Sequence, residues 1–209
     1  MALVKLINRG VRSVSTFGSI SSLGSYTFIK KVTASSSGTV SFVDGSSDVV
    51  LDNTYKEYLF TFKDIHPSAT GSGVNFSFNG STDSGSNYNA TKTTALFRTY
   101  NYEGADTTTL GFDSTPALAQ STAFQTLTTN NTNPNDGSNV GILHLYDPSS
   151  TTYIKHFTCV TSQNTFNGEN CMNNYVAGYF NTTSAIDAIQ FKFASGNVDA
   201  GDICLYGIN

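Results

Sequence analysis

The chain has 209 residues and carries charged side chains at only 12% of its positions, against about 25% in an ordinary soluble domain. That length fits one β-rich domain with a substantial core. The net charge is −4, and the sequence offers no basic surface with aromatic residues of the kind that binds single-stranded nucleic acid. No window of the sequence approaches the roughly 18 apolar residues of a membrane span. Hydroxyl and amide side chains must therefore keep the surface soluble, which is typical of virion and secreted proteins.

The N-terminal segment, residues 1–24, differs from the rest of the chain. Its only charged side chains are those of Lys5, Arg9 and Arg12, whereas the body is anionic. A run of small residues around Phe17 follows and offers little apolar surface to bury. We expect an extended anchor or linker arm that docks on a partner through Lys5, Arg9, Arg12 and Phe17. The alternative is that the three cations only improve solubility. The apolar start is too short for a signal peptide.

Short segments of alternating apolar and polar residues follow the arm. In Val74–Gly80, the side chains of Val74, Phe76 and Phe78 must share one face, because side chains in a strand alternate with period two. Clusters of Gly, Asn, Asp and Pro separate such segments and favour tight turns. No sustained helical period with caps occurs, so residues 25–209 are predicted to form one all-β domain, a sandwich or a barrel.

The predicted strands follow one another at short intervals. We expect them at residues 26–34, 38–43, 47–51, 55–65, 73–80, 94–101, 108–112, 140–147, 152–160, 174–181, 186–194 and 202–208. The segment 117–127 favours a turn or two of helix after a proline. Two longer polar loops, residues 81–93 and 128–139, are candidate contact surfaces.

No arrangement of acids, bases or nucleophiles predicts catalysis. The sequence contains no GxSxG, Walker or GxGxxG motif, and turn preference already explains the loop carboxylates, which include Asp113. We therefore predict no enzymatic activity and no cofactor. The three cysteines have no metal-ligand spacing and no even pairing, which fits assembly in a reducing cytoplasm.

Two histidines, His144 and His156, flank the predicted turn at Asp147. A simple hairpin around Asp147 sets residue 144 opposite 154 and brings His144 and His156 together on one face. A two-histidine metal or pH-sensing site is one interpretation. The default is that each imidazole bonds to a neighbouring strand, and we predict no metal site.

Glycan contact is a further hypothesis. Tryptophan is absent, so tyrosines remain as stacking platforms for sugars, together with amide side chains in the loops. The candidate glycan-binding residues are Tyr88, Asn89, Tyr100 and Tyr102.

Several ordered blocks of sequence together resemble a known family. The blocks are YKEYLFTFKDIHPSATGSGVNFSFNGS (55–81), SNYNATKTTALFRTY (86–100), LHLYDPSSTTYIKHF (143–157), VAGYFNTTSAIDAIQFKFASGNVDAG (176–201) and LYGI (205–208). They are similar to virion structural and tail-fibre proteins of tailed phages that infect marine bacteria, especially cyanobacteria. The blocks cover most of residues 26–209.

The resemblance implies a jelly-roll-like antiparallel β-sandwich, often a homotrimer, at the end of a fibre or on the head surface. It implies phage capsid or tail proteins as partners and a position on the virion surface after assembly in the host bacterial cytoplasm. No catalytic residue comes with the family. Long fibres place a shaft before such a domain, so the short arm favours a short fibre, a knob or a decoration protein. The alternative is a receptor-binding module that recognises a host surface glycan.

Overall fold

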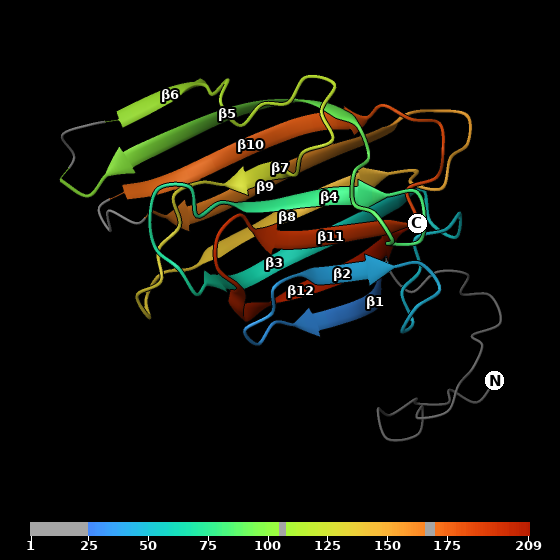
Figure 1. Ribbon diagram of the computed structural model, residues 1–209, viewed down its shortest axis with the longest axis horizontal. Helices are drawn as coiled ribbons and strands as arrows, with labels where there is room; N and C mark the ends of the chain where they lie inside the picture. Colours follow the sequence, from blue (N-terminus) through green and yellow to red (C-terminus); the bar gives the residue numbers. More distant parts are fainter. Residues whose placement is uncertain (1–24, 105–107, 166–169) are drawn as a thin grey trace, which may run out of the picture.

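The computed structural model describes residues 25–104, 108–165 and 170–209 (Figure 1). The predicted arm, with Lys5, Arg9, Arg12 and Phe17, lies outside the described residues. Within these ranges the chain forms strands and no helix. The strands are β1 (Tyr26–Thr33), β2 (Val40–Val43), β3 (Glu57–Pro67), β4 (Phe76–Ser81), β5 (Lys92–Tyr102), β6 (Thr108–Phe112), β7 (Gln125–Thr128), β8 (Asn139–Tyr146), β9 (Lys155–Asn164), β10 (Asn170–Phe180), β11 (Ala188–Phe193) and β12 (Val198–Ile208).

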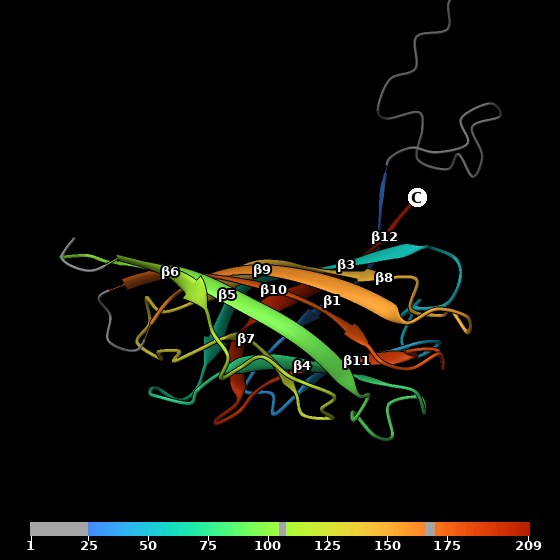
Figure 2. The ribbon, with the colours of Figure 1, turned by 90° about the horizontal axis from the view of Figure 1, so that it is seen from above.

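The strands form two antiparallel sheets that pack face to face (Figure 2). The larger sheet has eight strands in the order β1-β12-β3-β8-β9-β10-β5-β6, and the smaller has four in the order β2-β11-β4-β7. The predicted all-β sandwich is therefore confirmed.

The strand order contains the nested pairing of a jelly roll. Eight strands remain when β5, β6, β9 and β10 are set aside. These eight strands pair from the two ends of the chain inward: β1 with β12, β2 with β11, β3 with β8 and β4 with β7. This is the double Greek key of a jelly roll. The four remaining strands enter as two insertions and widen the larger sheet on one side of β8.

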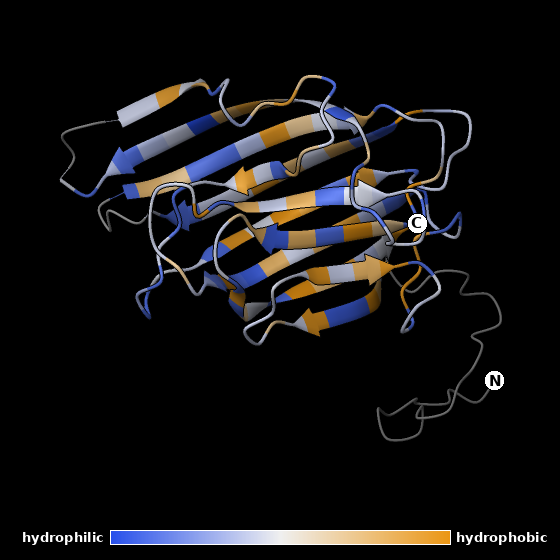
Figure 3. Ribbon diagram, in the orientation of Figure 1, coloured by the Kyte–Doolittle hydropathy of each residue, from blue (hydrophilic) through white to orange (hydrophobic). Residues whose placement is uncertain are grey.

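An aromatic cluster fills the space between the sheets. Phe191 of β11 is fully buried and lies at the centre of this cluster. Its ring centroid is within 6.3 Å of those of five other phenylalanines, which come from both sheets: Phe42, Phe60, Phe62, Phe76 and Phe78. Bands of hydrophobic and hydrophilic residues alternate along these strands (Figure 3). The period-two pattern of the sequence is thus the pattern that makes this core.

Two predicted elements are wrong. Residues 47–51 form no strand, because Ser47 and Asp48 adopt positive φ values of 51° and 65° and turn the backbone. Val49 and Leu51 are still buried, which explains the alternation that suggested a strand.

The segment 117–127 is not helical. Its backbone bonds to β5 instead: Thr94 N donates to Leu118 O (2.9 Å), and Lys92 and Ser121 exchange two hydrogen bonds. A strand that the sequence did not indicate, β7, begins near its end.

Candidate functional site

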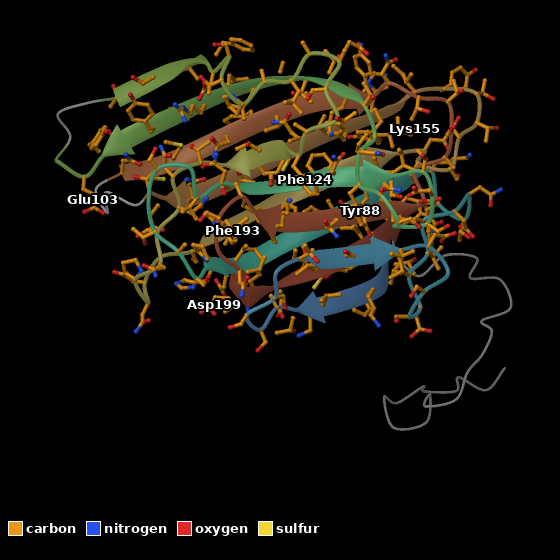
Figure 4. The ribbon with its side chains drawn as sticks, in the orientation of Figure 1. Tyr88, Glu103, Phe124, Lys155, Phe193 and Asp199 are labelled. Atoms are coloured by element: carbon orange, nitrogen blue, oxygen red, sulfur yellow. The ribbon has the colours of Figure 1, made fainter. Side chains whose placement is uncertain are left out.

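The four predicted glycan-binding residues fall into two separate pairs. Tyr88 and Asn89 lie in the loop before β5, whereas Tyr100 and Tyr102 lie near the end of that strand. Eleven residues of strand span roughly 35 Å. Figure 4 accordingly shows Tyr88 and Glu103, which follows β5, on opposite sides of the molecule. One sugar unit cannot contact both pairs.

The loop that holds Tyr88 is tied down by its own polar groups. Asp83 accepts hydrogen bonds from the Ser81 hydroxyl (2.6 Å) and from the backbone and side-chain nitrogens of Asn87 (2.8 and 2.7 Å). These bonds lower the pKa of Asp83 to about 2. The carbonyl of Tyr88 also accepts a bond from Asn79 Nδ2 (2.7 Å). The loop is therefore an ordered part of the sandwich.

Tyr100 and Tyr102 lie beside a polar pocket that the sequence did not indicate. Their rings meet edge to face at 5.7 Å. Arg98, Tyr100 and Tyr102 occupy every second position of β5 and therefore lie on the same face of the strand. The residues between them point outward. Arg98 lines a pocket of about 360 Å³, whose other lining residues are Ser72, Gly73, Asn75, Asp113, Thr115, Pro116, Thr126, Thr129 and Asn130. Hydroxyl and amide groups dominate this lining.

One ion pair is the charged element of that pocket. Arg98 Nη2 lies 2.9 Å from Asp113 Oδ2, and its Nη1 donates to Thr129 Oγ1 (3.1 Å). In the sequence, turn preference alone accounts for Asp113. The two residues are fifteen positions apart in the chain, and the β5–β6 hairpin brings them together, which no motif encodes.

A buried acceptor lies next to this pair. Asn174 of β10 is the register partner of Arg98. It is fully buried, and its amide nitrogen donates to Thr161 Oγ1 (3.3 Å), but its Oδ1 has no partner among the described residues. A water or ligand hydroxyl would satisfy that oxygen, because an unpaired buried acceptor costs about 1–3 kcal/mol.

The predicted hairpin register is wrong, but both histidines lie at outward positions of neighbouring strands, and His156 is two positions along β9 from the register partner of His144. The observed register places His144 opposite Thr158, four residues beyond position 154, because the connection after β8 is longer than a tight turn. His144 bonds to Glu57, and His156 packs against Tyr179 at 5.8 Å. Among the described residues no group of three or more His, Cys, Asp or Glu could hold a metal ion.

Two buried lysines have structural partners. Lys92 Nζ donates to the carbonyls of Ala90 (3.0 Å) and Ala123 (2.6 Å), and Lys155 Nζ to those of Thr182 (3.1 Å) and Ser184 (2.6 Å). Burial lowers the pKa of both, that of Lys92 to about 7. Each ammonium group fixes loop carbonyls at the end of the sandwich where β5 and β9 begin.

The outer face of the larger sheet has an unusual composition. Outward positions on the four neighbouring strands β8, β9, β10 and β5 carry no Asp, Glu, Lys or Arg in the described residues. Several carry exposed apolar side chains instead: Val140, Ile142, Val160 and Phe97, with Leu110 and Phe112 on β6. The register aligns Ile142, Val160, Tyr175, Phe97 and Phe112 in one row across the strands. We call this surface the uncharged face.

Comparison with family models, with curated proteins and with solved structures finds no match to this chain. Within the described ranges, no helix has the length and apolar character needed to cross a membrane.

Proposed function

We propose that this protein is a non-enzymatic structural protein of a phage virion. It acts as a short fibre, knob or decoration component, displays its sandwich on the particle surface and attaches through residues 1–24 to capsid or tail proteins. The similarity of residues 55–81 and the later blocks to phage virion and tail-fibre proteins supports this role. The jelly-roll pairing of the strands agrees with what that similarity implies.

The uncharged face carries the proposal most directly. An antiparallel sheet with one face in water normally alternates apolar residues inward with polar residues outward. On β9 and β10 the outward positions include Val160, Tyr175 and Tyr179 instead. The cores of protein interfaces are depleted in charged residues and enriched in aromatic ones. Such a face supports a role in a protein assembly.

The arm is tested by deletion. A phage that encodes the chain without residues 2–24 should produce particles that lack this protein, while the purified truncated chain keeps the β-sheet circular dichroism and cooperative unfolding of the full chain. Normal incorporation of the truncated chain would refute the anchor. Substituting Lys5, Arg9 and Arg12 together by Gln separates the charge of the arm from its length.

A second function, recognition of a host surface glycan, is supported by the Arg98 pocket. Sugars are bound by planar polar groups and hydroxyls together with aromatic faces. The pocket offers the Arg98–Asp113 pair, several neutral side chains and the adjacent Tyr100 and Tyr102.

The glycan function is tested on an array of bacterial surface polysaccharides. The full chain should bind at least one neutral glycan, and Arg98→Met and Thr126→Val should each weaken that binding. Tyr153→Ala, which changes an exposed residue that does not line the pocket, is the matched control. Absence of binding by the full chain at high concentration would remove this function.

A further inference from the structure

The uncharged face is large enough to be a complete interface. Its five neighbouring strands, from β8 to β6, lie ~4.8 Å apart and cover ~24 Å, and about eight residues of each strand except the five-residue β6 extend for ~27 Å. The projected area is therefore roughly 600 Å². Each partner in a specific protein–protein interface buries about 600–1,000 Å². The face therefore reaches the lower end of that range.

The charge of the face limits what that partner can be. A partner with a charged surface would bury its ions against side chains that offer no opposite charge, and unpaired buried charges are costly. The face of a second copy of this chain meets the requirement, because it is equally free of Asp, Glu, Lys and Arg on β8, β9, β10 and β5. Two such faces meet without like-charge repulsion.

The face also carries a ridge and a hollow side by side. Phe97 of β5 and Tyr175 of β10 stack in parallel with centroids 4.7 Å apart, and Phe97 is 46% exposed. The next pair along the same strands is Ala95 and Ala177, which with Gly178 form the floor of a mostly apolar depression of about 350 Å³. Consider a two-fold axis that runs perpendicular to the strands, between the Phe97–Tyr175 row and the Ala95–Ala177 row. This axis places the stacked rings of each copy over the depression of the other copy.

We propose that the uncharged face binds the same face of a second copy of the chain, as an isologous dimer interface. The inference names a partner for the structural role proposed above, on which it rests for its biological setting. A two-fold interface uses the same patch on both subunits and closes the assembly at two copies. The axis passes near Val160, a 40% exposed residue of β9, which is one of the five strands of the uncharged face.

A pair of charge variants at Val160 tests the inference. The two Val160 side chains lie within about 7 Å of each other along the strand direction, since neighbouring outward positions are separated by that length. Val160→Lys alone or Val160→Glu alone therefore places like charges together in the dimer. Each variant should weaken dimerisation at least about ten-fold, whereas an equimolar mixture of the two should restore it as a heterodimer.

The measurement is the mass of the full chain by light scattering coupled to size-exclusion chromatography. The expected mass of the unmodified chain is twice 22.3 kDa. Tyr153→Lys, which changes a 71% exposed residue in the β8–β9 connection, should leave that mass unchanged. Recovery in the mixture also shows that both charge variants are folded.

Three results would overturn the inference: a monomer at the highest soluble concentration, a trimer, or charge variants that stay dimeric when separate. The proposed virion role fails by a different result, absence of the chain from purified particles. A chain that is dimeric in solution but absent from particles would support the dimer interface and contradict the virion role. A chain that is monomeric in solution but present in particles would support the virion role and contradict the dimer interface.

Discussion

Removal of the Phe191 ring should destabilise the protein more than any exposed aromatic substitution. Phe191 is fully buried and contacts rings from both sheets, so Phe191→Ala leaves a cavity at the point where the two layers meet. A buried Phe→Ala change costs about 3–5 kcal/mol, and lost edge-to-face partners such as Phe62 at 5.2 Å favour the upper half of that range. We expect about 4 kcal/mol.

Urea titration of the unmodified chain and of the Phe191→Ala variant gives the free energy of unfolding of each protein, and the two m-values are compared. Phe191→Leu, which keeps part of the volume, should cost about 1–2 kcal/mol. Tyr153→Ala, at a 71% exposed residue, should change the stability by less than about 0.5 kcal/mol. A Phe191→Ala protein within about 1 kcal/mol of the unmodified chain would refute the central position of this ring in the core.

Three further predictions follow from particular residues. Gly207→Ala should cost about 2 kcal/mol, since its Cβ would meet the Tyr55 ring at 2.2 Å, whereas Gly111→Ala, with no atom within 4 Å, should be nearly neutral; thermal melts compare the two. Burial lowers the pKa of Lys92 from 10.5 to about 7, so between these pH values the unfolded chain binds a proton that the folded chain has released. The free energy of unfolding should therefore rise with pH across this interval, and Lys92→Met should flatten the rise in urea titrations at several pH values. Cys159, which is buried and whose pKa burial raises, should react with a thiol reagent only after denaturation, as peptide mapping can show; modification in the folded protein would contradict its position.

The sequence alone predicts those strands in which the alternation of apolar and polar residues reflects burial. Val74, Phe76 and Phe78 were predicted to share a face, and all three are buried between the sheets. Eleven of the twelve observed strands were expected within a few residues of their bounds. β7 was missed because its polar side chains are buried: Gln125 accepts a hydrogen bond from Thr94 Oγ1 (2.5 Å), so no apolar alternation marks the strand.

Pairing between distant segments could not be predicted. The alternation of apolar and polar residues indicates that a strand has a buried face. It does not indicate which sheet the strand joins, or by how many residues a connection shifts the register of two paired strands. The four-residue difference at His144 and the meeting of Arg98 with Asp113 both depend on such pairing. The outward Val160 and Phe97 were visible in the sequence as apolar residues, yet only the strand order places them on one surface.

A cryo-EM reconstruction of the phage particle that encodes this chain tests the virion role most directly. The proposed role predicts density for a two-layer sandwich, with eight strands in one sheet and four in the other, at symmetry-related positions on the particle surface. Density on the head would assign a decoration or knob component, and density at the tail would give the Arg98 pocket a position from which it faces the host. Purified particles with no such density and no peptide from this chain would contradict the proposal.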